Sequence, residues 1–409
     1  MLRKTFYILV ILALAFTSCK KDKKETKTED FRITGNIMEM YYPDKSLQAK
    51  GPVIIEEKEG KSVNIKDGDW TFYHKESKGK AVAATGKFAR DKRDGVWMVY
   101  YPNGQLKTET TYSDGALNGV TKNYTDAGKL QSVVYYVNNR VAGKKVSYFR
   151  NGQVEKEEHY LDGKKNGKST SYYDNGNLRI VANYSEDKLK GQYTEYYPDG
   201  KKKMEGKYVP VPQSKIDENP ALAAKEGDKV GTWTLYHKNG NRFMTGGYSD
   251  GKMSGKWQQY AEAGWLESEG LYSEGTKDGI WKYYSSKKQL EKEYYFQKDM
   301  VNGTCRIYEN GKLKGEGEMN GLPKGPKKMG AWKEFYPSGR VEFEGFYQMD
   351  RKNGKFREYH PNGKLKAEGE YMNNKRNGMW TFYKTDGVTK DEELSGMYMM
   401  DKLKQNLGR

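Results

Sequence analysis

Glycine recurs along this chain at a nearly fixed interval, and this interval limits what the chain can fold into. Thirteen glycines each precede an aromatic-rich stretch, and nine of the 12 steps between them are 24 residues. Two further steps are 27 residues and one is 40. Such a period predicts stacked supersecondary units rather than one large globular core. These anchor glycines, each numbered zero in its copy, are Gly68, Gly95, Gly119, Gly143, Gly167, Gly191, Gly231, Gly255, Gly279, Gly303, Gly330, Gly354 and Gly378.

Each copy has the pattern of a β-hairpin. Position +5 is aromatic in every copy, and in the copy that starts at Gly95 it is Tyr100. A turn of the Pro-Asn-Gly type follows at 102–104, and Leu106 and Tyr112 occupy +11 and +17. Pro-Asn-Gly suits a three-residue loop in which a type I turn is followed by a left-handed glycine. This loop pairs +5 with +11 across the hairpin.

The faces of the hairpin follow from this pairing. Residues two apart, and residues opposite each other, share a face of a sheet. We therefore expect +5, +11 and +17 to form a buried ladder of Tyr, Leu and Tyr. Positions +2, +6 and +14 should lie on the opposite, partly hydrated face, although a two-residue loop would reverse the assignment.

The predicted hydrated face carries the candidate binding residues. Position +2 is Trp in seven copies, but three consecutive copies have Thr121, Lys145 and Ser169 instead. The tryptophans form either a second packed layer or an open stacking surface. The candidate binding face comprises Trp70, Trp97, Trp233, Trp257, Trp281, Trp332 and Trp380 at +2, with Tyr101, Tyr173, Tyr197 and Tyr336 at +6.

The predicted fold is all-β: an elongated array of about 13 antiparallel β-hairpin repeats forming a twisted single ribbon. The ends of such an array need capping. We assign residues 31–67 to a degenerate repeat or cap, 68–208 and 229–397 to repeats, and 398–409 to a C-terminal tail. A Pro-containing insertion, 209–228, separates the two parts of the array.

The N-terminus reads as a targeting signal. Arg3 and Lys4 precede an apolar run that is too short for a membrane-spanning helix, which is typical of a secretory signal over residues 1–18. The stretch from Phe16 to Cys19 resembles the lipobox of bacterial lipoproteins. The resemblance implies lipid attachment at Cys19, a polar tether over 19–30, and a place in the bacterial cell envelope, either periplasmic or at the cell surface.

The repeats resemble a known family. The segments "GVWMVYYPNGQL" at 95–106, "GAWKEFYPSGRV" at 330–341 and "GKFREYHPNGKL" at 354–365 are similar to the bacterial variant form of the MORN repeat. The resemblance implies β-hairpin repeats that contact proteins or lipids. Some bacterial members of the family are classed as antitoxin-like.

The sequence shows no grouping of catalytic or metal-binding residue types apart from those that recur with the repeat. Three of the four histidines, His74, His237 and His360, occupy +6, where other copies have Tyr or Phe, so this position accepts a flat polar ring. Gaps of more than 120 residues keep these histidines from converging on one metal in a linear array. We expect no enzyme activity, no cofactor and no metal site.

The chain has a net charge of +17, and some of its basic residues recur at a fixed position of the repeat. Position −2 is basic in eight copies, and we treat these residues as a candidate basic rail along one edge. The rail either protects strand edges and keeps the chain soluble, or binds anionic lipid, glycan or an acidic partner. The signal sequence argues against nucleic acid. The residues are Lys66, Arg93, Lys165, Lys229, Lys277, Lys328, Lys352 and Arg376.

Together these features predict a non-catalytic, lipid-anchored repeat scaffold that mediates protein–protein interaction in the cell envelope. Its membrane contact would be the lipid on Cys19. Two alternatives stay open: a surface glycan-binding or adhesin-like module, and an antitoxin-like inhibitor of a secreted toxin.

Overall fold

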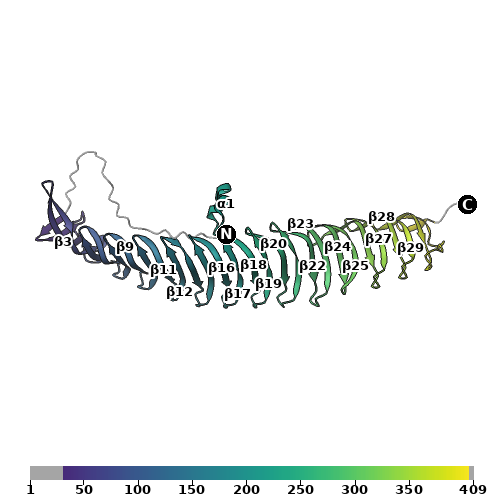
Figure 1. Cartoon of the computed structure of the whole chain (residues 1–409), viewed down its shortest axis with the longest axis horizontal. Coiled ribbons are helices and arrows are strands. Elements are labelled where there is room, and N and C mark those ends of the chain that lie inside the picture. The colour runs from purple at the N-terminus through teal and green to yellow at the C-terminus, as the bar shows by residue number, and fades with distance from the viewer. Residues whose placement is uncertain (1–30, 405–409) are drawn as a thin grey trace.

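A computed structural model describes residues 31–404 of the chain, and Cys19 with its predicted signal and tether lies outside this range. The described residues form an elongated antiparallel ribbon whose strands follow one another along the long axis (Figure 1). From β5 onward nearly every strand pairs with the strand before it and the strand after it. No helix within 31–404 is long and apolar enough to span a membrane.

The amino-terminal part of the array contains β1 to β17. Their bounds are β1 Phe31–Thr34, β2 Ile37–Tyr41, β3 Leu47–Lys58, β4 Lys61–Lys66, β5 Gly68–Tyr73, β6 Val82–Ala89, β7 Lys92–Tyr100, β8 Leu106–Ser113, β9 Ala116–Tyr124, β10 Leu130–Val137, β11 Arg140–Tyr148, β12 Val154–Leu161, β13 Lys164–Lys165, β14 Gly167–Tyr172, β15 Leu178–Ser185, β16 Lys188–Tyr196 and β17 Lys202–Val209.

The carboxy-terminal part contains β18 to β32. Their bounds are β18 Asp228–Tyr236, β19 Arg242–Ser249, β20 Lys252–Tyr260, β21 Leu266–Ser273, β22 Thr276–Tyr284, β23 Leu290–Gln297, β24 Met300–Glu309, β25 Lys312–Gly321, β26 Lys327–Phe335, β27 Val341–Gln348, β28 Arg351–Tyr359, β29 Leu365–Met372, β30 Lys375–Phe382, β31 Gly396–Met399 and β32 Lys402–Lys404.

The interruption between β17 and β18 contains two short helices, α1 (Gln213–Glu218) and η2 (Pro220–Ala224). The insertion projects from one edge of the ribbon (Figure 1). The ladder continues beneath it, because β17 pairs directly with β18 from Met204↔Leu235 to Val209↔Asp228. Lys188 Nζ donates to the Lys225 carbonyl at 3.1 Å and so ties the insertion to β16. A third short helix, η1 (Lys75–Ser77), lies in the first 27-residue step.

The hairpin loops have the predicted geometry. Tyr101 N–H donates to the Gln105 carbonyl at 2.8 Å, and Gly104 has a φ of +85° in the left-handed region. Tyr100 at +5 pairs with Leu106 at +11. The Pro-Asn-Gly turn therefore closes a three-residue loop as its chemistry requires.

The predicted sheet faces are wrong, because a β-bulge lies just beyond each of these loops. In the copy that starts at Gly255, Tyr260 pairs with Leu266, but the preceding residue, Gln259, pairs with Ser268. The extra residue at +12 reverses the side-chain alternation along the second strand. As a result +17 lies with +2, and +14 lies with +5. We call the first the aromatic face (+2, +13, +15, +17) and the second the groove face (+1, +3, +5, +14, +16).

Glycine is needed at the anchor position for a conformational reason. Gly255 and Gly279 have φ values of +70° and +76°, which other residues rarely adopt. They sit at an irregularity of the ladder, since Gly246 pairs with Trp257 while the next residue, Gly247, pairs with Ser254. The anchor glycine thus allows each strand to bend where it leaves the previous repeat.

Aromatic rings on the aromatic face form the core. Trp257 and Trp281 are fully buried and alternate with Tyr248, Tyr272 and Phe296 along the ribbon axis. Ring centroids lie 5.3 Å apart for Tyr248–Trp257 and 5.2 Å apart for Tyr272–Trp281, both edge-to-face. Such pairs add about 0.5–1.5 kcal/mol each to the burial of their area. A single-layer sheet thus obtains a core by packing its rings lengthwise.

Each tryptophan ring covers a glycine of the preceding repeat. A Cβ built on Gly270, at +15, would meet the Trp281 ring at 2.4 Å, and one on Gly246 would meet Trp257 at 2.2 Å. Trp281 Nε1 also donates to the Leu271 carbonyl at 2.9 Å. The same contact recurs at Gly51–Trp70, Gly86–Trp97, Gly206–Trp233, Gly317–Trp332, Gly345–Phe356 and Gly369–Trp380.

Where the ring is missing, the glycine is missing too. The copies with Thr121, Lys145 and Ser169 at +2 follow copies that carry Thr110, Val134 and Glu158 at +15. Cys305 at +2 likewise follows Tyr294 at +15, and both are buried. In these three copies a smaller side chain than Trp at +2 is therefore matched by a larger residue than glycine at +15 of the preceding copy. The loss of Trp is a packing change and not a pattern on an accessible surface.

Glu158 is the least expected of these replacements. Its side chain is buried, and its Oε1 lies 2.8 Å from Lys156 Nζ and 3.0 Å from Lys165 Nζ. Burial, reinforced by the neighbouring Glu158 carboxylate, raises the pKa of Tyr160 to about 12. An ion-paired cluster thus fills the space that a tryptophan ring and a glycine share elsewhere.

Volume matching between repeats predicts a coupled pair of substitutions. Gly270→Val should destabilise the chain by about 1–3 kcal/mol, because its side chain overlaps the Trp281 ring. Trp281→Thr should cost about 3–5 kcal/mol through the cavity that it leaves. The double variant should lose at least about 1 kcal/mol less than the sum, since it recreates a small-residue pair such as Thr110/Thr121.

The measurement is a double-mutant cycle by urea unfolding, with Leu271→Val on the groove face of the same strand as the control for β-propensity. Strict additivity of the two losses would contradict direct ring-over-glycine packing.

Candidate functional site

The tryptophans named as candidate binding residues do not form an accessible surface. All seven are 0–2% exposed. The aromatic face is therefore a packed layer, and the hypothesis of an open row of stacking rings is wrong for these seven residues. The physical reason is the contact with the glycine at +15, which lets each ring lie against the backbone of the repeat before it.

The aromatic residues at +6 hold neighbouring repeats together. The hydroxyls of Tyr101, Tyr173, Tyr197 and Tyr336 each donate to the carbonyl of the +5 residue in the next copy, at 2.7–3.0 Å. These four rings are half-buried, so they are structural as well as partly accessible. The histidines at +6 lie in the same way: His237 Nε2 is 2.9 Å from the Tyr260 carbonyl.

The basic residues at −2 do not form an open rail either. Lys277 Nζ lies 3.9 Å from the centroid of Trp281, and Lys229 Nζ lies 4.3 Å from that of Trp233. Burial lowers the pKa of the Lys229, Lys277 and Lys352 ammonium groups. The other members also lie over rings: Lys66, Arg93, Lys165, Lys328 and Arg376.

These cation–π contacts cover the outer side of the ring layer, and each is worth about 0.5–1 kcal/mol or more when partly desolvated. Of the eight cations only Arg93 is exposed. Most of the predicted rail thus serves the packing of its own repeat, and a row of free cations for anionic ligands is not present at −2.

The groove face carries a ladder of paired charges and tyrosine hydroxyls. Glu344 at +14 accepts a hydrogen bond from Tyr359 Oη of the next copy at 2.8 Å and pairs with Lys333 Nζ at 3.3 Å. Glu368 repeats the arrangement with Tyr383 Oη at 3.2 Å and Arg357 Nε at 3.4 Å. The hydrogen bond from Tyr359 is the main cause that holds the pKa of the Glu344 carboxyl below its usual range.

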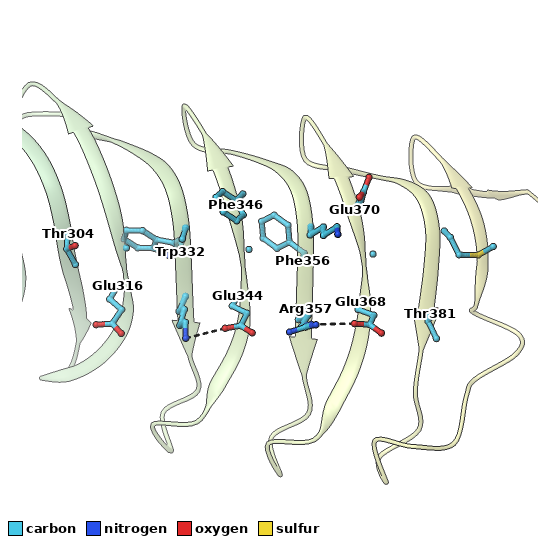
Figure 2. A pocket seen from close by; sticks show the side chains of 17 residues that line it. Thr304, Glu316, Trp332, Glu344, Phe346, Phe356, Arg357, Glu368, Glu370 and Thr381 are labelled. Atoms are coloured by element: carbon cyan, nitrogen blue, oxygen red, sulfur yellow. Dashed lines mark hydrogen bonds and ion pairs between the residues drawn. The ribbon is translucent and has the colours of Figure 1, made fainter.

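A groove opens on this face between β24 and β30. Its volume is about 920 Å³. Figure 2 shows Glu316, Glu344, Arg357 and Glu368 in one row across neighbouring strands, with Phe346 in a second row. The groove is lined by Thr304, Glu316, Gly317, Ala331, Trp332, Lys333, Glu344, Gly345, Phe346, Lys355, Phe356, Arg357, Glu368, Gly369, Glu370, Met379 and Thr381.

Apolar side chains stand exposed beside the charge ladder. Phe346 is 56% and Met379 62% exposed, and both belong to the groove. Elsewhere on the same face, at +1 and +16, the exposed apolar residues are Val96, Val120, Tyr135, Leu271, Ile280 and Tyr295. A face with regular paired charges and exposed apolar residues is suited to contact with another macromolecule.

Residues 31–404 contain no group of three or more His, Cys, Asp or Glu side chains that could hold a metal. Cys305 is fully buried, and burial raises the pKa of its thiol. This thiol is therefore placed for packing rather than for reaction.

Comparison with known proteins identifies the family. Eight segments match the profile of the MORN repeat variant: 93–114, 117–138, 143–162, 165–186, 189–209, 253–274, 330–349 and 352–373. The chain belongs to this family of repeat proteins, whose architecture indicates a repeat-based binding scaffold. A search of curated protein sequences gives no match.

Solved structures show only distant likeness. A TcdB2-TccC3-Cdc42 crystal structure and a Photorhabdus luminescens Tc holotoxin pore are each 13% identical, with TM-scores of 0.17, over 85% and 88% of this chain. This chain spans 20% and 23% of those chains. A porin-like protein from Bacteroides uniformis is 12% identical over 54% of this chain and 92% of its own, with a TM-score of 0.14.

Sequence reasoning missed the groove and its residues. The exposed positions +1 and +16 vary between Val, Lys, Leu, Ile, Phe and Glu, so they carry no periodic signal. The correlation between +15 and the following +2 can be read from the sequence, because glycine at +15 accompanies Trp or Phe at +2 of the next copy. That signal would have placed the tryptophans in the core and left the opposite face for binding.

The Glu344 contacts predict how stability depends on pH. Because the folded pKa of this carboxyl lies below its unfolded value, its contribution is present above the unfolded pKa of about 4.3 and is lost as pH falls through the folded pKa. Glu344→Gln should therefore destabilise the chain by about 1 kcal/mol at pH 7 and by less at pH 3. Urea unfolding at both pH values measures this, with Glu262→Gln in an exposed turn as the control. A loss independent of pH would contradict the role assigned to the charged form.

Proposed function

We propose that this chain is a non-catalytic scaffold of the bacterial cell envelope, anchored by a lipid on Cys19, that binds a protein partner along its groove face. The observation that carries the proposal is the groove itself, with exposed Phe346 and Met379 beside paired Lys333–Glu344 and Arg357–Glu368. The aromatic face is fully engaged in packing, which leaves the groove face as the extended surface for a partner.

Two features favour a protein over a polyanionic ligand. The carboxylates of Glu293, Glu344 and Glu368 at +14 on this face are each paired with a nearby cation, so this row presents short-range polarity rather than a field of one sign. The exposed apolar side chains beside them would release water on contact with a complementary apolar surface. Interfaces between proteins combine such an apolar centre with a polar surround.

The glycan-binding alternative loses its main support. Sugar stacking requires accessible rings, and the tryptophans that would have supplied them are buried. The exposed tyrosine and phenylalanine rings on the groove face are Tyr135, Tyr295 and Phe346, which lie six and two repeats apart and so form no continuous row. Binding to cell-wall or capsular glycan therefore stands as an outcome of the test below.

Site-specific cross-linking in intact cells tests the proposal. A photo-reactive amino acid placed at Phe346 or at Met379 should each capture the same protein partner, because both side chains line one groove. Placed at Leu322, which is 67% exposed in the loop after β25, it should capture markedly less. Equal capture from Leu322, or retention of the chain on glycan with no protein captured, would overturn the proposal.

Lipid attachment predicts a change in location. Cys19→Ala should move the chain from the membrane fraction to the soluble fraction of the envelope, because the predicted anchor is lost. Intact-mass measurement of the wild type should show acylation at residue 19, and Ser18→Ala serves as the matched control that keeps the cysteine. Unchanged membrane association of the Cys19→Ala variant would contradict the anchor.

A further inference from the structure

The row of packed rings is interrupted at one place along the ribbon. The last ring contact of the amino-terminal part joins Trp97 to Tyr112, with centroids 6.4 Å apart. The next one along the chain joins Tyr193 to Tyr208 at 5.3 Å. Among the described residues no ring–ring contact lies between Tyr112 and Tyr193. We call residues 113–192 the middle segment, and it holds the three consecutive copies that lack Trp at +2.

Polar side chains take the place of the rings in this part of the interior. Seven polar or charged side chains are buried within residues 31–404, and four of these occupy +15 or +2 in or next to the middle segment: Thr110, Thr121, Glu158 and Ser169. Thr121 Oγ1 has no hydrogen-bond partner among the described residues. A buried hydroxyl without a partner costs free energy, and small side chains bury less apolar area than a tryptophan ring. These hairpins are therefore held to one another less tightly than the ring-packed ones.

A missing tryptophan alone does not interrupt the core. Cys305 also stands in place of Trp at +2, but it lies with Val301 in one continuous buried apolar cluster. The middle segment lacks such a connection. Its buried apolar residues are Val134, Ala182 and Leu189, and they belong to neither of the two buried clusters of the ribbon.

The backbone is also less regular here. In the copy that starts at Gly167 the first strand is divided into β13 and β14, whereas the equivalent strands of the neighbouring copies, β11 and β16, are continuous. The division falls at Asn166, next to Lys165, whose ammonium group pairs with the buried Glu158 carboxylate at 3.0 Å. Interior packing and strand continuity therefore change at the same part of the ribbon.

We propose that the middle segment is a hinge between two stiff blocks, residues 31–112 and 193–399. Bending the ribbon toward or away from its aromatic face changes the spacing of the side chains on that face. Rings packed against one another resist this change, because close-packed interiors are hardly compressible. The Thr, Ser and Lys side chains of the middle segment are small or flexible, so bending concentrates there.

The hinge gives the groove freedom of direction. The groove between β24 and β30 belongs to the second block, whereas the predicted tether joins the first block at Phe31. The second block can therefore turn while the first keeps its orientation. The inference concerns the ribbon alone, so it rests neither on the lipid anchor nor on a partner.

Hydrogen exchange of the folded full chain is the first test. In a uniform linear array the ends open most readily, so central repeats should exchange slowly. The hinge reverses this order, and the amides of β9–β15 should exchange at least about tenfold faster than those of β20–β23. Equal or slower exchange in β9–β15 would overturn the inference. All samples carry Cys19→Ala, and the other cysteine, Cys305, is buried.

Distances between spin labels test the bending itself. Asn103→Cys with Asp199→Cys places labels on either side of the middle segment. Ala263→Cys with Asn362→Cys is the matched pair within the second block. All four positions are +8 in exposed hairpin loops, and each pair spans four repeats, or at most about 38 Å of ribbon. The first pair should give the wider distribution of distances.

Restoring the rings should remove the hinge. One variant gives the three joints of the middle segment glycine at +15 and tryptophan at the following +2. Its β9–β15 amides should exchange about tenfold more slowly than those of the wild type, and its 103–199 distances should narrow. The substitutions are Thr110→Gly with Thr121→Trp, Val134→Gly with Lys145→Trp, and Glu158→Gly with Ser169→Trp.

Two smaller variants accompany this one. Thr110→Gly with Thr121→Trp alone should extend the first block by one copy, which keeps the test informative if the six substitutions together prevent folding. Gly270→Thr with Trp281→Thr is the converse control, and it should speed exchange in β21 and β22 while leaving β9–β15 unchanged. Urea unfolding establishes that each variant is folded.

The remaining outcomes also decide the matter. Fast exchange in β9–β15 with equal distance distributions overturns the inference, because local opening without bending is not a hinge. Unchanged exchange in every folded ring-restoring variant overturns it as well, because the missing rings would then not be the cause. None of these results depends on capture of a partner, so the hinge and the proposed function can fail separately.

Discussion

The contact of one ring with one glycine, repeated along the chain, holds this structure together. A hairpin of two short strands is barely stable in water, and a single sheet has no second layer to cover it. Laying Trp281 against Gly270 of the preceding repeat solves both problems, because each hairpin completes the core of its neighbour. The tyrosines at +17 and the cations at −2 then enclose the rings, which pack into two clusters, one from Met38 to Trp97 and one from Trp257 to Tyr398.

Burying the rings on one face determines what the other face can do. Relieved of any part in the core, the groove face can carry polar pairs such as Lys333–Glu344 and still leave Phe346 exposed. The Tyr359–Glu344 bond also links one repeat to the next on this side. Residues on this face recur from one repeat to the next, which suits the proposed contact with an extended partner surface.

The sequence predicted the architecture well and its faces poorly. Pro-Asn-Gly at 102–104 determined the loop and the pairing of Tyr100 with Leu106, because turn chemistry is local. The bulge at +12 depends instead on the fit of whole strands, and residues as different as Lys107, Phe243 and Glu267 occupy that position. No residue type signals this extra residue in the sequence. Its presence places +14 and +17 each on the face opposite to the predicted one. As a result, the candidate site lies on the face that carries Phe346 and not on the face that carries the Trp332 ring.

Ring-over-glycine packing also limits which repeats can be deleted or duplicated, because the two repeats brought together must have matching residues at +15 and +2. Removing residues 255–278 would bring Gly246 next to Trp281, two partners that already fit, and shorten the ribbon by one hairpin. Removing 279–302 would bring Gly270 next to Cys305 and leave an unfilled gap above the glycine. Gain and loss of repeats by recombination should therefore favour some junctions over others. Repeats should therefore be lost or gained most easily where a glycine at +15 meets Trp or Phe at +2 of the copy that it joins.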